Sequence, residues 1–266
     1  MPRLVATVFG RTETALLAAI VVTAAILSVS SPYFLTVPNL VNLIEAYSVT
    51  TILATGVFVV LVSGGIDISF TATASAAQYL AAYLASVHGL PLVPTLLLGA
   101  ALGIALGSIN ALLTYYLRVV SIIVTIATSS VYYALLIYFT NAREIYNLPD
   151  GWSDPIVFFR YVTASGAVVK ITLPIVAMIV VVLLTQYLMS RTRIGRQIYA
   201  LGGNPEAANR VGINVLRVQL FAYGYLGFLA AVGGFIQAYR VHQAVPTAMA
   251  GQELNVLAVA ILGGAS

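Results

Sequence analysis

The chain has 266 residues, of which 61% are hydrophobic and only 8% are charged, and its mean hydropathy is +1.00. A water-soluble domain of this length would lack the polar groups to cover its surface, so the composition predicts a protein that lies in a lipid bilayer. The net charge of +4 is small and comes from basic residues between apolar runs, which argues against a nucleic-acid partner, and the absence of cysteine excludes disulfides and thiolate metal sites.

Seven apolar stretches follow one another along the chain, and most are near the roughly 20 residues that a helix needs to cross a bilayer. An unpaired backbone cannot face lipid, so every spanning segment should be helical. We therefore expect an all-α, polytopic membrane protein with seven or eight transmembrane helices in a single transmembrane domain, residues 1–266. The first stretch is interpreted as an uncleaved span rather than a secretory signal, because no convincing small-residue cleavage site follows it. The stretches are residues 14–29, 48–62, 70–87, 93–117, 119–140, 171–189 and 218–239.

Basic residues predict which side of the membrane each connection faces. Arginines concentrate in residues 190–217, where Glu206 is the single acidic residue, and others lie at the N-terminus and at Arg118. Because cytoplasmic connections carry an excess of arginine and lysine, this pattern places the N-terminus and residues 190–217 in the cytoplasm and residues 141–169 outside. We expect a multi-pass protein of the cytoplasmic (inner) cell membrane. The clustered arginines are Arg191, Arg193, Arg196, Arg210 and Arg217.

Residues 141–169 form the longest polar connection, and Pro149 and Asp150-Gly151 predict turns in it. Two interpretations stay open. The connection is either a cap over the outer mouth of the bundle or a solvated loop whose Trp152 and tyrosines lie at the membrane interface, and the second is the usual place for such side chains. Tyrosines near the ends of the spans, among them Tyr132 and Tyr223, are likewise expected to be interfacial anchors rather than contacts for a transported molecule.

Two apolar runs each close in a pair of glycines, Gly64-Gly65 and Gly263-Gly264. Paired interruptions in corresponding halves of a chain are typical of discontinuous helices around a transport pathway. Close packing of helices through small residues explains the same spacing equally well. The pattern therefore indicates a weak internal repeat, with either a pathway or a packing role for the glycines.

Asp67 follows the first glycine pair and is the ionisable residue nearest to the predicted spans in that region. A charge near the bilayer is costly and usually marks a function or a structural partner. A carboxylate just before a helix accepts backbone N–H bonds and suits the positive end of the helix dipole. We expect Asp67 to cap the helix that begins near Ser69.

Several segments together carry a family resemblance. They are Gly64-Gly65-Ile66-Asp67-Ile68-Ser69, the Asn110 segment with Gly103, Gly107 and Thr125, the loop of residues 195–213, and the terminal segment from Gln252-Glu253-Leu254 to Gly263-Gly264-Ala265-Ser266. In this order they resemble the permease subunits of ribose-type sugar ABC importers, the branch that handles ribose, xylose and galactose. Asn255 stands where that family commonly has aspartate. The family continues with further spans, so we expect a chain that is truncated at its C-terminus, where residues 254–262 are too few to cross a bilayer at 1.5 Å per residue.

The resemblance implies a set of partners. The chain would form half of a channel with a second permease subunit, in a homodimer or heterodimer. Cytoplasmic ABC ATPase subunits would hydrolyse the ATP, and an extracytoplasmic sugar-binding protein would deliver the solute. The sequence has no Gly-x-x-x-x-Gly-Lys phosphate loop, and its one lysine is Lys170, so we expect a transport subunit that is not an enzyme and binds no cofactor itself.

The resemblance also assigns two groups of site residues. The loop of residues 190–217 is expected to dock on the ATPase: Asn204 can cap a short helix, Pro205 suits its first turn, and Glu206 favours its N-terminus. An ordinary amphipathic surface loop is the alternative. The proposed coupling residues are Arg193, Gly195, Arg196, Gly202, Gly203, Asn204, Glu206, Ala207, Ala208 and Gly212; the pathway or gate candidates are Gly64, Gly65, Asp67, Ser69, Asn110, Gly263 and Gly264; no catalytic or metal-binding set is expected.

Other functions remain as alternatives. The solute of an ABC permease of this plan could instead be a nucleoside or a branched-chain amino acid. An ion-coupled transporter would ordinarily carry carboxylates or histidines inside its spans, whereas His88 and His242 fall near predicted outer ends. An intramembrane hydrolase ranks last, because no histidine or lysine is placed to activate a serine at that depth.

Overall fold

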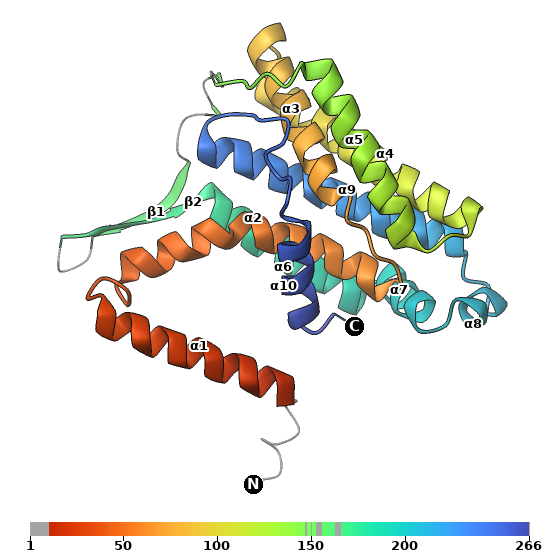
Figure 1. Ribbon diagram of the computed structural model, residues 1–266, viewed down its shortest axis with the longest axis horizontal. Helices are drawn as coiled ribbons and strands as arrows, with labels where there is room; N and C mark the ends of the chain where they lie inside the picture. The colour runs from red at the N-terminus through yellow and green to blue at the C-terminus, as the bar shows by residue number, and fades with distance from the viewer. Residues whose placement is uncertain (1–10, 147, 150, 153–155, 163–165, 266) are drawn as a thin grey trace. The chain divides into compact units, whose positions relative to one another are not determined.

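The computed structural model describes residues 11–146, 148, 149, 151, 152, 156–162 and 166–265 (Figure 1). Most of them are helical. In chain order the elements are α1 (Arg11–Ser30), α2 (Val37–Val62), α3 (Phe70–His88), α4 (Leu92–Leu117), α5 (Ser121–Thr140), β1 (Val157–Val162), β2 (Val168–Thr172), α6 (Leu173–Arg191), α7 (Arg193–Gly203), α8 (Pro205–Arg210), α9 (Val215–Val241) and α10 (Glu253–Leu262).

The chain divides into two compact units. The first, Met1–Ala46 with Val157–Ile171, holds α1, the beginning of α2 and the two strands. The second, Tyr47–Ile156 with Thr172–Ser266, holds the remaining helices. Every residue of the candidate site described below belongs to the second unit.

Five of the seven predicted apolar stretches each lie within one helix, and the stretches of residues 119–140 and 171–189 each begin two residues before theirs, α5 and α6. Within the part of the chain that the structure describes, five helices are long and apolar enough to cross a membrane, namely α2, α4, α5, α6 and α9. The helix that contains the second apolar stretch is longer than that stretch, because α2 already begins at Val37 and runs for 26 residues. α3 has 19 residues, and its buried threonine, serine and glutamine side chains make it less apolar than the five.

The all-α expectation needs one correction, because β1 and β2 pair in a two-stranded sheet. They lie in and just after the polar connection of residues 141–169. Valine, phenylalanine, tyrosine and isoleucine dominate both strands, and such β-branched and aromatic residues favour extended backbone. The turn residues of this connection led to the prediction of a loop without strands.

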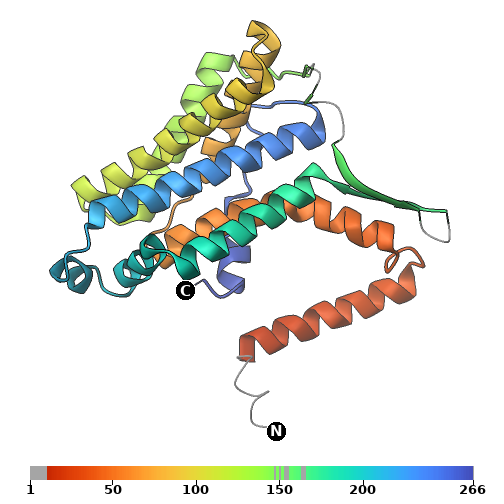
Figure 2. The ribbon, with the colours of Figure 1, turned by 180° about the vertical axis from the view of Figure 1, so that it is seen from behind.

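The core of the second unit is built on a close crossing of α4 and α9, which lie side by side in both views (Figures 1 and 2). Gly103 and Gly227 meet there. A Cβ atom added to either glycine would overlap the backbone carbonyl of the other. Small residues at such positions let two membrane helices approach until their backbones touch. α3 packs against both helices and closes the group on one side.

The connections between the helices lie at two opposite ends of this bundle. At one end, which we call the α7 end, the α2–α3 connection contacts α5 and α7. At the other end, the connection after α5 pairs with the connection after α9 through an antiparallel bridge between Ile145 and Ala244. The long helices of the second unit therefore run in alternating directions, as a polytopic arrangement requires.

Trp152 lies at the second end and is only 2% exposed. Its ring meets that of Phe235 edge to face, with 6.4 Å between centroids, and it packs in a cluster with Tyr79, Leu148 and Ala238. The interpretation of Trp152 as an interfacial anchor is therefore wrong. It covers the ends of α3 and α9, which agrees with the alternative that this connection caps the bundle.

Large apolar side chains remain exposed along the spanning helices of the second unit. Leu97 on α4, Ile123 on α5 and Leu183 on α6 are each more than half exposed. A water-soluble protein rarely leaves so much apolar surface uncovered. These faces are suited to lipid.

Candidate functional site

The first glycine pair ends α2 in a left-handed helix cap. Gly64 has φ +86°, and the N–H of Gly65 donates to the carbonyl of Val60 at 3.1 Å. The second pair ends α10 in the same way, since Gly264 has φ +95° and the N–H of Ala265 donates to Ala260 at 3.2 Å. Glycine adopts this backbone without the steric cost that a Cβ brings. The weak repeat in the sequence is therefore a repeated helix terminus.

Asp67 lies in the connection between α2 and α3 and is 2% exposed. Its Oδ1 atom accepts hydrogen bonds from the backbone N–H and the hydroxyl of Ser69, both at 2.7 Å. Its Oδ2 atom accepts a bond from the amide of Asn110, on α4, at 3.2 Å. Asp67 therefore binds the N-cap residue Ser69 and not an N–H within α3, which differs from the expected cap, and its carboxylate fastens the connection to α4.

The donors and acceptors of this cluster are matched. The Asn110 amide nitrogen also donates to the Ser69 hydroxyl at 2.6 Å, and the hydroxyl of Tyr132 lies 3.2 Å from the Asn110 carbonyl oxygen. Tyr132 also donates to the carbonyl of Leu106 at 3.0 Å. A buried carboxylate is tolerated when its oxygens find donors of this kind. Tyr132 belongs to this network and is 8% exposed, so its interpretation as an interfacial anchor is wrong.

α5 holds the backbone of the same connection. The N–H of Ile66 donates to the Ser121 hydroxyl at 2.8 Å, and the Thr125 hydroxyl donates to the carbonyl of Ile66 at 3.2 Å. The N–H of Ile68 reaches Thr125 at 3.4 Å. Ser121 was not predicted as a site residue. The sequence signal that could have indicated Ser121 is that it and Thr125 lie one turn apart at the start of an apolar helix.

Gly65 faces α9. A Cβ atom added at this position would meet the hydroxyl and ring of Tyr223, which is 1% exposed. Tyr223 is therefore a buried residue of the bundle and not an interfacial anchor. The structure brings together five of the predicted gate residues, namely Gly64, Gly65, Asp67, Ser69 and Asn110.

The predicted docking segment lies directly against the end of α2. Gly202, near the end of α7, approaches so closely that an added Cβ would overlap the carbonyl of Val62 and lie 3.2 Å from the N–H nitrogen of Gly64. Ile198 and Leu201 on the same helix are buried in the main core, at 0% and 1% exposure. α7 is therefore fixed to the bundle by one face and touches the gate candidates through Gly202.

The opposite face of α7 and most of α8 are exposed. Arg193, Arg196 and Glu206 point their side chains into solvent. The Asn204 side chain accepts a hydrogen bond from the N–H of Ala207 at 2.9 Å and caps α8, with Pro205 in its first turn. These local expectations are confirmed. Ala208 differs from Ala207, because it is buried at 3% exposure and does not contribute to the surface.

Three other predicted residues lie apart from these contacts. Gly263 lines a cavity between α2, α6 and α10. An added Cβ atom would meet nothing within 4 Å at Gly203, and nothing within 4 Å at Gly264. The structure thus separates Gly202, which makes a close contact, from its neighbour Gly203, which does not.

A polar face of α3 was missed by the sequence reasoning. The Thr71 hydroxyl donates to the carboxylate of Glu253 at 2.6 Å, and the Ser75 hydroxyl accepts the N–H of Met249 at 3.3 Å. The Gln78 amide donates to the carbonyl of Val245 at 3.2 Å. These residues hold the segment that precedes α10. Their spacing of three and four residues was the available signal.

The helical bundle and its lipid-suited faces define a polytopic membrane protein with a basic amphipathic segment at one end. Residues 39–266 match the family described as "branched-chain amino acid transport system / permease component". The chain belongs to this family. As a permease component it is a transport subunit and not an enzyme.

Individual relatives are similar over most of the chain. The ribose import permease protein of Haemophilus influenzae is 34% identical over 251 residues, which cover 93% of this chain and 75% of the relative. The D-allose transport system permease protein of Escherichia coli K12 is 32% identical, with 90% of this chain and 71% of the relative covered. The galactose/methyl galactoside import permease protein of Salmonella typhimurium is 31% identical, with 93% and 76% covered. No solved structure matches the chain significantly. The resemblance to ribose-type permeases is confirmed.

Proposed function

We propose that the chain is the membrane-spanning permease subunit of an ATP-driven importer and that it passes a monosaccharide into the cell. The observation that carries this proposal is the similarity to three sugar permeases over at least 90% of the chain. Pentoses and hexoses both occur among the names of these relatives, so the proposed solute class is the neutral monosaccharide. Seven helices, α1 to α6 and α9, would cross the bilayer as one permease domain, with α10 as a partial eighth.

The proposed partners follow from this role. Cytoplasmic ABC ATPase subunits would dock on the exposed face of α7 and α8, a second permease subunit would complete the channel, and an extracytoplasmic binding protein would deliver the sugar. ATP would be hydrolysed by the ATPase subunit, and this chain would bind no cofactor. The N-terminus and residues 190–217 would be cytoplasmic. The contact of Gly202 with Val62 supports a direct mechanical route from the docking surface to the α2–α3 connection.

Two variants test the docking role. Glu206→Arg reverses the charge in the first turn of α8, and we expect it to prevent co-purification of the ATPase subunit and to abolish sugar uptake while insertion in the membrane is unchanged. Glu144→Arg is the matched control, because Glu144 is also exposed and lies at the opposite end of the bundle. Retention of both the ATPase and uptake in Glu206→Arg would show that α8 is not a docking element.

A branched-chain amino acid is the second candidate solute, because the family description names that class. Uptake of labelled ribose, allose and galactose is compared with uptake of labelled leucine in cells that produce the complete importer. We expect sugar uptake that excess leucine does not reduce. Leucine uptake without sugar uptake would replace the proposed solute class.

A further inference from the structure

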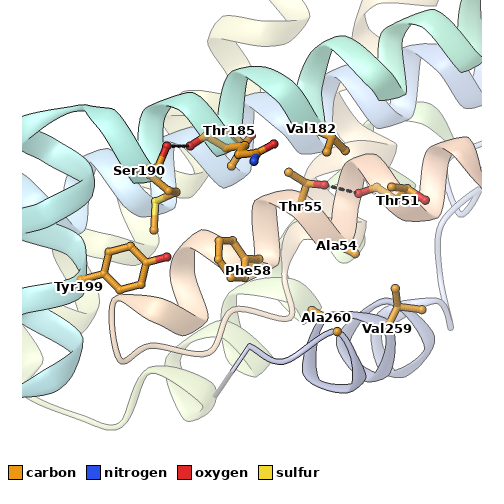
Figure 3. Close-up of a pocket in the computed structure, with 13 residues that line it drawn as sticks. Thr51, Ala54, Thr55, Phe58, Val182, Thr185, Ser190, Tyr199, Val259 and Ala260 are labelled. Carbon is orange, nitrogen blue, oxygen red and sulfur yellow. Dashed lines mark hydrogen bonds between the residues drawn. The ribbon is translucent and has the colours of Figure 1, made fainter. Parts of the chain in front are cut away.

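A cavity of about 410 Å³ lies beside the candidate gate in the second unit (Figure 3). α2 contributes Thr51, Thr55 and Phe58, α6 contributes Thr185, Gln186 and Ser190, and Tyr199 extends into it from α7. α10 closes another side with Val259, Ala260 and Gly263. The volume lies within the range of roughly 300–1,000 Å³ that small-molecule sites occupy.

Three polar side chains near the end of α6 line this cavity. The helix runs from Ile175 to Leu184 without a polar side chain, and then Thr185, Gln186 and Ser190 all line the cavity. An amide or hydroxyl that faces hydrocarbon lacks hydrogen-bond partners, and this costs free energy. This side of α6 is therefore suited to water or a polar solute, whereas Leu183 on another face is suited to lipid.

Hydrogen bonds within the helices determine what the lining offers to a ligand. The hydroxyls of Thr51, Thr55 and Ser190 donate to backbone carbonyls one turn earlier, at 2.9, 2.7 and 2.6 Å. Their protons are thus occupied, and their oxygen lone pairs remain as acceptors. The Gln186 amide and the Tyr199 hydroxyl add donors. The cavity can accept several hydroxyl protons at once.

None of the described residues that line the cavity is charged. A zwitterionic amino acid would leave its ammonium and carboxylate without opposite charges there, at a high desolvation cost. A sugar has only neutral hydroxyls, and the apolar face of its ring can lie on Phe58 and Ala260. The lining therefore favours a neutral polyol over a charged solute.

We propose that this cavity is a monosaccharide-contact site on the transport route, with Thr55, Gln186 and Tyr199 as its polar contacts and Phe58 as its apolar wall. The assignment rests on the proposed sugar-import function and adds the place in the chain where the sugar is held. Tyr199 belongs to α7 and lies one turn before Gly202, so movement of the docking segment would change the cavity directly.

Substitution tests the polar contacts. Thr55→Val and Gln186→Leu each remove hydrogen-bonding groups from the lining, and we expect the KM for sugar uptake to rise about 2- to 10-fold for each, which is the equivalent of one lost neutral hydrogen bond. Co-purification of the ATPase should not change. Thr50→Val is the matched control, because Thr50 is the same residue type on the same helix and does not line the cavity. An unchanged KM in both variants would overturn the proposal.

Chemical labelling tests whether a sugar occupies the cavity, and it does so independently of ATP hydrolysis by the partner subunit. The chain has no cysteine, so Thr55→Cys supplies a single thiol in the cavity. We expect a small water-soluble methanethiosulfonate reagent to modify it, and ribose, allose or galactose, whichever is transported, to slow that reaction while leucine does not. A thiol that is unreactive, or that reacts at the same rate with a saturating transported sugar, would overturn the site but leave sugar import intact. Failure of the unmodified protein to import any sugar would overturn the proposed function and, with it, this assignment.

Discussion

Single residues decide whether the α2–α3 connection can keep its shape. Asp67 is an ionisable group in a protein whose composition is 8% charged, and its oxygens receive three side-chain and backbone donors from Ser69 and Asn110. A hydrogen bond to a charged group contributes roughly 1.5–3 kcal/mol to the free energy of unfolding, and a buried carboxylate left without donors would be strongly destabilising. The network therefore ties the connection to α4 more firmly than an apolar contact of the same area would.

Gly202 and Gly203 are neighbours in α7, and the space around them differs. A Cβ at Gly202 would overlap the Val62 carbonyl, whereas a Cβ at Gly203 would meet nothing within 4 Å. We expect Gly202→Ala to displace α7 at a cost of roughly 1–3 kcal/mol, which is typical of overpacking, and to lower the uptake rate about tenfold. Gly203→Ala should lower uptake much less than Gly202→Ala, because no atom of this chain opposes the added methyl group, and it should raise the thermal stability slightly, because alanine favours a helix.

The measurements are the initial rate of sugar uptake per amount of protein and the Tm in detergent. Equal effects of the two substitutions would show that the contact between Gly202 and α2 carries no coupling.

Elements were predicted from sequence where the responsible interactions are local. Asn204, Pro205 and Glu206 specify the start of α8 through capping chemistry within four residues, so the sequence was sufficient. The seven apolar stretches located seven helices for the same reason, since hydropathy is a property of each segment alone.

Features that depend on distant contacts were not predictable in this way. The bond between Asp67 and Asn110 joins residues 43 positions apart, and the contact between Gly202 and Val62 joins residues separated by about half of the chain. Glycine composition could not separate Gly202 from Gly203, because only the neighbouring element distinguishes them. The prediction for Trp152 failed because it relied on the usual environment of tryptophan at the membrane interface. In the structure Trp152 instead packs on Phe235, which is distant in sequence.

The polar face of α3 leads to a prediction about the segment before α10. Thr71→Val keeps the shape of the side chain but removes the donor to Glu253, which leaves the carboxylate without that bond. We expect faster amide hydrogen exchange in residues 249–256, because loss of a hydrogen bond to a carboxylate loosens both partners.

Thr73→Val is the matched control, since Thr73 is equally buried on α3 and no hydrogen bond of its side chain to Glu253 is formed. Hydrogen exchange followed by mass spectrometry measures both variants. The polar face would not hold this segment if exchange there were the same in Thr71→Val and in the unmodified protein.

At the scale of the whole molecule, the mechanism depends on which end of the bundle faces the cytoplasm. The α7 end carries Arg193 and Arg196 on exposed positions, and the bundle's other end carries the connection that contains Tyr146. Since arginine concentrates on the cytoplasmic side, we predict that Asn209, on α8, is cytoplasmic and that Tyr146 is outside. Both side chains are exposed, so neither position requires unfolding to react.

Single cysteines in this cysteine-free chain measure the orientation without background labelling. Tyr146→Cys should react with a membrane-impermeant maleimide in intact cells, and Asn209→Cys should react only after the membrane is permeabilised. Because ATP and the ATPase subunits are cytoplasmic, docking through α7 and α8 requires this result. Labelling of Asn209→Cys in intact cells, with Tyr146→Cys protected, would invert the bundle and remove the proposed docking surface from every ATPase subunit that could drive import.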